Sequence, residues 1–259
     1  MKDLIKIIMN GEHIAFTDNK HSVVVKGDCL EVMKDIPDKS IDMILCDLPY
    51  GTTACKWDTI IPFEPLWEQY KRVIKDNGAI VLFGSEPFSS YLRLSNIKDF
   101  KYDWIWNKKL AGNGILAKRQ PLKIHEIVSV FNSKIYLPQK TKGVFRKKMG
   151  LKESEITGGD SFSKEVQNDD YYPTSIQEFS MGGYRIGRLH PTQKSTELCE
   201  YLIKTYTNEG DLVLDNCAGS GTTGVACKNL NRNFILIEKE QEYIDIINKR
   251  LDPPPHPTL

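Results

Sequence analysis

The 259-residue sequence has almost no net charge, because 35 Lys and Arg residues stand against 34 Asp and Glu residues. Any affinity for nucleic acid must therefore come from local clusters of basic residues. The sequence also lacks an apolar run near the roughly 20 residues that cross a bilayer. Its polar start, MKDLIK, lacks the hydrophobic core of a signal peptide. We expect a cytoplasmic protein with no membrane partner.

Metal-binding patterns of cysteine are absent as well. No two of the six cysteines form a C-x-x-C pair, and several lie within apolar runs. This distribution favours reduced, mostly buried thiols over disulfides or a zinc site, so we expect no metal. The six are Cys29, Cys46, Cys55, Cys199, Cys217 and Cys227.

Short apolar segments alternate with helical patterns along most of the chain, which predicts an α/β fold with a mostly parallel sheet. Asn10-Gly11, between residues 4–9 and 13–17, favours a tight turn and predicts an N-terminal hairpin. The expected strands are residues 22–26, 41–46, 79–83, 103–106, 124–131, 212–214 and 233–237. The expected helices are residues 64–75, 88–95, 196–207, 222–230 and 240–250.

The alternation stops between residues 133 and 189, which we interpret as an insertion into the α/β domain. Its first part is basic, with no acidic residue before Glu153. Two interpretations stay open: an arm that contacts phosphates, or a solvated charged loop. The candidate phosphate contacts are Lys140, Lys142, Arg146, Lys147 and Lys148.

A glycine-rich turn follows the strand that ends at Asp215. Glycines there let the backbone turn tightly and let a ligand approach closely. Gly219, Gly221 and Gly224 match G-x-G-x-x-G, so a nicotinamide dehydrogenase has to be considered. Only 38 residues follow Gly221, however, so most strands precede the turn. That order indicates a circularly permuted nucleotide fold, which is unusual for dehydrogenases.

A second motif, Asp47-Leu48-Pro49-Tyr50, ends the apolar segment 41–46. An exocyclic amine is a poor nucleophile because its lone pair is delocalised into the ring. A carboxylate such as Asp47 and the carbonyl of Leu48 or Pro49 can accept its two N–H groups and expose the lone pair. The Tyr50 ring can stack on an extruded base, and Trp57 can wall the pocket. Taken alone, the motif also fits an ordinary turn after a strand.

Together the two motifs resemble those of the permuted (β-class) DNA amino-methyltransferases, the family of N6-adenine and N4-cytosine enzymes, and especially the small methylases of phages and prophages. The resemblance extends over nearly the whole chain, through Gly27-Asp28-Cys29-Leu30, the Asp47 motif, Lys123-Ile124-His125-Glu126, His190-Pro191-Thr192-Gln193-Lys194 and the glycine turn. It implies a Rossmann-like, circularly permuted sheet of seven strands with helices on both faces. Residues 1–132 and 190–259 would form the catalytic domain, and residues 133–189 a target-recognition insertion.

The resemblance also implies roles for individual residues. Asp47, Pro49 and Tyr50 would be catalytic, and Leu48, Trp57 and the basic residues of the insertion would bind substrate. His125 and Glu126 are expected to be structural, and Asp28 can alternatively cap a helix. S-adenosylmethionine would be the cofactor, contacted by Asp28, Lys194, Asp215, Cys217, Ala218, Gly219, Ser220, Gly221, Thr222, Thr223 and Glu238.

The implied partner is double-stranded DNA, and a homodimer is possible because family members often dimerise. Asp47 as the first residue of its motif favours N6 of adenine, with N4 of cytosine as the alternative. An inactive nucleic-acid-binding module is the alternative of a different class. The sequence departs from the family pattern at Leu48, at Asn216-Cys217 and at Ser195, which can cap the following helix.

Overall fold

The computed structural model describes residues 14–17, 22–52, 58–148, 166–180 and 193–251. The chain divides into two compact units, which we call the sheet unit (residues 1–137 and 175–259) and the hairpin unit (residues 138–174). The predicted strand 4–9 and its Asn10-Gly11 turn lie outside the described residues. Among the described helices, none combines the length and the apolar character that a membrane crossing requires.

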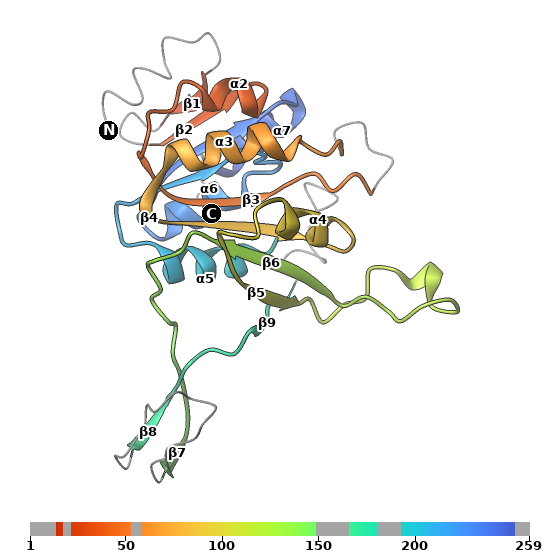
Figure 1. Cartoon of the computed structure of the whole chain (residues 1–259), viewed down its shortest axis with the longest axis vertical. Helices are drawn as coiled ribbons and strands as arrows, with labels where there is room; N and C mark the ends of the chain where they lie inside the picture. The colour runs from red at the N-terminus through yellow and green to blue at the C-terminus, as the bar shows by residue number, and fades with distance from the viewer. Residues whose placement is uncertain (1–13, 18–21, 53–57, 149–165, 181–192, 252–259) are drawn as a thin grey trace, which may run out of the picture. The chain divides into compact units, whose positions relative to one another are not determined.

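The sheet unit is built on a nine-stranded sheet in the order β1-β2-β11-β10-β3-β4-β6-β5-β9 (Figure 1). The five strands from β2 to β4 are parallel, and β6 and β5 complete the seven predicted strands in antiparallel pairings. Two short edge strands add to these seven: β1, which matches the predicted hairpin segment 13–17 and pairs with β2, and β9, which was not predicted. The strands are β1 (Ile14–Thr17), β2 (Val23–Lys26), β3 (Ile41–Asp47), β4 (Ile74–Gly84), β5 (Phe100–Asn107), β6 (His125–Phe131), β9 (Ile176–Glu178), β10 (Leu212–Asp215) and β11 (Asn233–Glu238).

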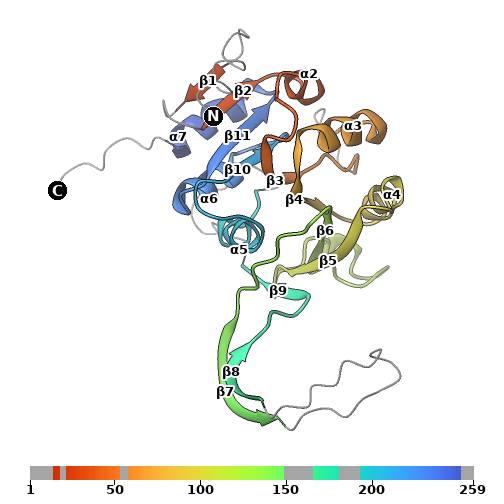
Figure 2. The same cartoon turned by 60° about the vertical axis from the view of Figure 1, so that its left-hand side comes forward.

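Helices cover both faces of the sheet, which confirms the predicted α/β class (Figure 2). Successive residues of a strand point to opposite faces, and both faces of β3 are buried. Ile44 packs with α2, α3 and α4, whereas Met43 packs with α5, α6 and α7. The helices are α2 (Cys29–Met33), α3 (Phe63–Val73), α4 (Phe88–Ser95), α5 (Thr196–Tyr206), α6 (Thr222–Asn229) and α7 (Gln241–Leu251).

Two helix starts follow from capping side chains. Asp28 accepts a hydrogen bond from the backbone N of Leu30 at 3.0 Å and caps α2. Ser195 caps α5 by accepting from the backbone N of Leu198 at 3.5 Å, as the sequence predicts.

Strand β4 begins earlier than the sequence predicts, and α3 is correspondingly shorter. Ile74 has an extended backbone and pairs with Ile41, so α3 ends at Val73 instead of continuing to Lys75. The polar stretch that follows Ile74 gives no strand signal of its own. It is held in the sheet partly by the ion pair between Lys75 and Asp42, at 2.7 Å.

The hairpin unit contains β7 (Thr141–Lys148) paired antiparallel with β8 (Val166–Tyr171). The sequence pattern of residues 133–189 predicts no strands, and that expectation is wrong for β7, β8 and β9. Polar cross-strand pairs replace the missing hydrophobic alternation. Lys142 contacts the carboxylates of Asp169 and Asp170 at 2.9 and 2.7 Å, so part of the basic segment is neutralised locally.

Candidate active site

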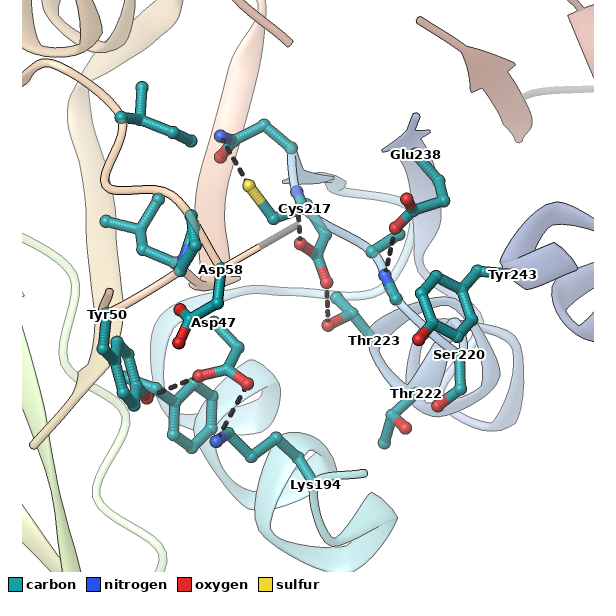
Figure 3. A pocket seen from close by; sticks show the side chains of 18 of the residues that line it. Asp47, Tyr50, Asp58, Lys194, Cys217, Ser220, Thr222, Thr223, Glu238 and Tyr243 are labelled. Carbon is teal, nitrogen blue, oxygen red and sulfur yellow. Dashed lines mark hydrogen bonds and ion pairs between the residues drawn. The ribbon is translucent and has the colours of Figure 1, made fainter. Parts of the chain in front are cut away.

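The parallel strands end along one edge of the sheet, and their last residues face a cavity of about 800 Å³ (Figure 3). Asp47 ends β3, Asp215 ends β10 and Glu238 ends β11. Ligands of open α/β sheets bind outside the carboxyl ends of the strands. Two motifs that are distant in the sequence therefore share one cavity, because β10 pairs directly with β3.

The glycine turn is held by the carboxylates at the strand ends. Asp215 accepts hydrogen bonds from the backbone N of Cys217 at 3.1 Å and from the hydroxyl of Thr223 at 2.6 Å. Burial raises the pKa of Asp215 to about 6, against the opposing effect of the Thr223 bond. Glu238 accepts from the backbone N of Gly219 at 2.7 Å, and burial raises its pKa as well.

Arg250 supports the same turn from α7. Its guanidinium donates to the carbonyl of Ser220 at 2.6 Å and to the hydroxyl of Thr222 at 3.2 Å. Gly221 stands at the start of α6 with a φ of +75°, a backbone conformation that glycine adopts without strain. A Cβ atom at Gly221 would lie 2.9 Å from the side chain of Ile247, so this glycine faces the core.

Asp47 lies in a chain of partly buried charges. Its Oδ1 accepts from the Tyr50 hydroxyl at 2.5 Å, and its Oδ2 contacts the ammonium of Lys194 at 2.9 Å. Lys194 also contacts Glu126 at 2.9 Å, and Lys108 contacts the other oxygen of Glu126 at 3.0 Å. Two carboxylates and two ammonium groups thus alternate, which offsets much of the cost of burying each charge.

This alternation sets the protonation of the site. Burial raises the pKa of Asp47, although the charge of Lys194 opposes that rise. Burial would also raise the pKa of Glu126, but the charges of Lys194 and Lys108 outweigh it and lower the pKa to about 2. The two carboxylates in turn raise the pKa of Lys194 despite its burial. Glu126 and Lys194 are therefore ionised at neutral pH.

Aromatic rings and a second carboxylate shape the pocket around Asp47. The Tyr50 ring lies 5.0 Å from that of Phe88, and the Lys194 ammonium lies 5.6 Å from the Tyr50 centroid. Asp58 accepts from the backbone N of Gly51 at 2.8 Å and of Thr52 at 2.9 Å, which closes the turn after the motif.

Most residues predicted for the site line the cavity. Gly221 does not, because it faces Ile247. Lys140 and Lys142 belong to the hairpin unit, as do Arg146, Lys147 and Lys148, whose backbones lie in β7. Trp57 lies outside the described residues. The predicted residues on the cavity wall are Asp28, Asp47, Leu48, Pro49, Tyr50, Lys194, Asp215, Cys217, Ala218, Gly219, Ser220, Thr222, Thr223 and Glu238.

The cavity wall also contains residues that were not predicted for the site, among them Trp106, Lys108, Glu126 and Tyr243. Trp106 and Glu126 are register partners on β5 and β6, which brings the end of β5 to the site. Glu126 belongs to a quoted motif but was expected to be structural. The structure places it in contact with the lysine that binds Asp47. Tyr243 contributes an aromatic ring near Glu238 and Ser220 (Figure 3).

Comparisons with known proteins agree with this geometry. The N6/N4 methyltransferase family model, described as DNA methylase, matches residues 41–249. The chain belongs to this DNA methylase family. The type II methyltransferase M.HpaI of Haemophilus parainfluenzae is 30% identical to this methylase over 88% of the chain and 74% of the relative. M.HinfI of Haemophilus influenzae is 30% identical over 89% of the chain and 68% of the relative.

Solved structures show the same fold. The crystal structure of the M1.HpyAVI–SAM complex matches with a TM-score of 0.60 and 29% identity, over 88% of this methylase and 98% of that chain. The cytosine-N4-specific PvuII methyltransferase matches with a TM-score of 0.67 over 94% of this chain and 90% of that one. At 18% identity the latter shows the shared fold alone.

S-adenosylmethionine is the cofactor of this methylase, and the cavity wall fits it. The turn from Ala218 to Ser220 presents backbone without bulky side chains, and Glu238 and Asp28 offer acceptors for hydroxyl or amine groups. Family members often place Pro-Phe where this chain has Asn216-Cys217. Tyr243 supplies an aromatic ring on the same cavity wall.

Proposed function

We propose that this methylase transfers a methyl group from S-adenosylmethionine to N6 of an adenine that is flipped out of duplex DNA. The observation that carries the proposal is the position of Asp47. Its carboxylate ends β3 in the cavity that the glycine turn also lines, next to the backbone of Leu48 and Pro49. Amine activation and cofactor binding therefore share one pocket.

The residues of the pocket act on the amine in a defined way. Asp47 accepts one N–H of the target amine and the carbonyl of Leu48 or Pro49 accepts the other, which frees the nitrogen lone pair. The cofactor supplies a methyl group on a positively charged sulfonium. The nitrogen forms a bond to that carbon as the carbon–sulfur bond breaks, and the extra amine proton then leaves to solvent.

An ionised carboxylate has about four lone-pair sites, so the amine can bond to Asp47 either beside Lys194 or after Lys194 moves away. Glu126 offers this lysine a second carboxylate at the same distance of 2.9 Å, so its charge stays compensated if it leaves Asp47. The Tyr50 ring remains available for stacking on the extruded base. In this proposal Lys194 also binds the methionine end of the cofactor.

Adenine is favoured over cytosine because Asp47 is the first residue of its motif. Enzymes of this family that modify N4 of cytosine often have Ser there, whereas adenine enzymes have Asp or Asn. Asp47 and Tyr50 are present together with Gly219 and Gly221, which argues against an inactive binding module, because such a module has no chemical need for both motifs.

For DNA recognition we propose the insertion of residues 133–189. Lys140, Arg146, Lys147 and Lys148 are the proposed phosphate contacts, and Lys142 adds to them if its pairing with Asp169 and Asp170 opens. Binding through phosphates predicts a strong dependence on salt concentration.

The test is methyl transfer from labelled S-adenosylmethionine to mixed-sequence duplex DNA. We expect the wild-type protein to label DNA and Asp47→Ala, which removes the acceptor for the amine N–H, to abolish labelling. Asp76→Asn, which alters a carboxylate that is 84% exposed, serves as the control and keeps activity. DNA binding without transfer by the wild type would refute the enzyme. Sequencing of the product with detection of modified bases identifies the base, and N4-methylcytosine would refute the choice of adenine.

A further inference from the structure

The connection between β5 and β6, residues 108–124, has a composition that the site does not explain. We call it the β5–β6 arm. It contains five basic residues and no acidic residue. Figure 1 shows it projecting beyond the ends of β5 and β6. The basic residues are Lys108, Lys109, Lys118, Arg119 and Lys123.

The arm is held in one conformation by its own hydrogen bonds. The backbone N of Lys108 donates to the carbonyl of Ile124 at 2.8 Å, and that of Gly112 donates to Lys123 at 3.2 Å. The Asn113 side chain accepts from the backbone N of Lys123 at 2.7 Å and donates to the carbonyl of Pro121 at 3.2 Å. A partner therefore meets a preformed element, which lowers the entropy cost of binding.

The tip of the arm carries an apolar side chain in water. The 3₁₀ helix η1 (Gly114–Leu116) places Ile115 with 99% of its surface exposed, and Leu122 is 49% exposed. Lys118 and Arg119 follow and are exposed too. Within the described part of the chain neither forms an ion pair, whereas Lys108 and Lys109 at the base pair with Glu126 and Glu178. The free charges are thus concentrated beside the apolar tip.

The base of the arm belongs to the active site. Leu110, Ala111 and Gly112 line the cavity that contains Asp47. The arm therefore forms part of the wall of the cavity that contains Asp47. Apolar side chains such as Ile are the residues that proteins insert between base pairs, and base-modifying enzymes must extrude their target.

We propose that the β5–β6 arm opens duplex DNA: Ile115 enters the base stack beside the target nucleotide, and Lys118 and Arg119 bind the neighbouring phosphates. The inference rests on the proposed function, because it assigns the arm to the same DNA substrate. The absence of acidic residues favours a polyanion over a protein groove as the partner.

The first experiment compares Ile115→Ala with Ile97→Ala, a matched variant whose isoleucine is 58% exposed outside the arm and the cavity. Single-turnover methylation is measured on a duplex that carries the target site mapped above. The target base is either paired or placed opposite an abasic position, where it needs no unpairing. We expect Ile115→Ala to slow methylation of the paired duplex by about tenfold, or about 1.4 kcal/mol. The abasic duplex should be methylated at nearly the wild-type rate, and Ile97→Ala should change neither.

The second experiment measures binding of a mixed-sequence duplex as a function of salt, and it needs no methyl transfer. Lys118→Ala/Arg119→Ala should reduce the slope of log affinity against log salt by about two, since each phosphate contact contributes about 0.9. Three results would overturn the inference. The double variant could leave the slope unchanged, or Ile115→Ala could slow methylation equally on the paired and abasic duplexes. The arm could also bind anionic lipid vesicles in place of DNA. A wild type that binds DNA with this slope but never methylates it would refute only the proposed function.

Discussion

Replacing Glu126 with Gln removes the carboxylate between Lys108 and Lys194 while keeping the shape of the side chain. The pKa of Glu126 falls from its ordinary value of 4.5 to about 2 in the folded protein. Each pKa unit corresponds to about 1.4 kcal/mol, so the ion pairs of Glu126 contribute about 3 kcal/mol to the free energy of unfolding at neutral pH. The conversion is meaningful here because only 15% of the side chain is exposed.

The sign of the pH dependence follows from the lowered pKa. The contribution is complete above pH 4.5, where the carboxyl is ionised in both the folded and the unfolded chain. It decreases as the pH falls from 4.5 toward 2 and is absent below pH 2, where both forms are protonated. Wild type and Glu126→Gln should therefore differ by about 3 kcal/mol at pH 7 and converge in acid.

Urea unfolding at a series of pH values measures this difference directly. Glu178→Gln is the matched control, because Glu178 pairs with Lys109 on the surface and both side chains are 55% exposed. Its effect should be far smaller, since water and salt screen such pairs. Equal stability of Glu126→Gln and the wild type at pH 7 would refute this reasoning. So would a difference in their free energies of unfolding that stays the same between pH 7 and pH 3.

Three further predictions concern the motif tyrosine, the glycine turn and the end of β11. Tyr50→Phe removes a hydrogen bond that lowers the pKa of Asp47, so the acid limb of the kcat profile should move to higher pH. Gly221→Ala should lower the free energy of unfolding by more than Gly210→Ala. Both glycines have a positive φ, so backbone strain in either alanine variant costs about 1–2 kcal/mol. Only at position 221 does the added Cβ also clash with Ile247. Glu238→Gln should weaken S-adenosylmethionine binding in calorimetry by about tenfold, because the carboxylate positions the backbone of Gly219, whereas the exposed Glu242→Gln should not.

The sequence predicted the sheet well where its strands are buried on both faces. The segments around Ile44 and Leu214 are continuous apolar runs, and such runs identify central strands without any knowledge of their neighbours. The residues at the strand ends, Asp47 and Glu238, were found for the same reason, because a polar residue directly after such a strand lies at the ligand edge.

The parts that were missed depend on pairing across elements. Glu126 reaches the site only because β6 is antiparallel to β5 and in register with Trp106, and no local pattern encodes that register. Strands β7 and β8 lack hydrophobic alternation and are joined by polar pairs such as Lys142 with Asp169. The conformation of the β5–β6 arm rests on the hydrogen bonds of Asn113, which a sequence pattern does not reveal.

The strand order has a consequence for synthesis on the ribosome. Strands β2 and β3 are consecutive in the chain, yet β11 and β10 lie between them in the sheet. A nascent chain that already contains Asp47 leaves this central gap open until the last quarter of the polypeptide emerges. Pairings between such distant segments form slowly and late. The cavity is therefore incomplete until β10 and β11 have been made, and a chain that lacks them has neither the glycine turn nor a continuous sheet beside Asp47.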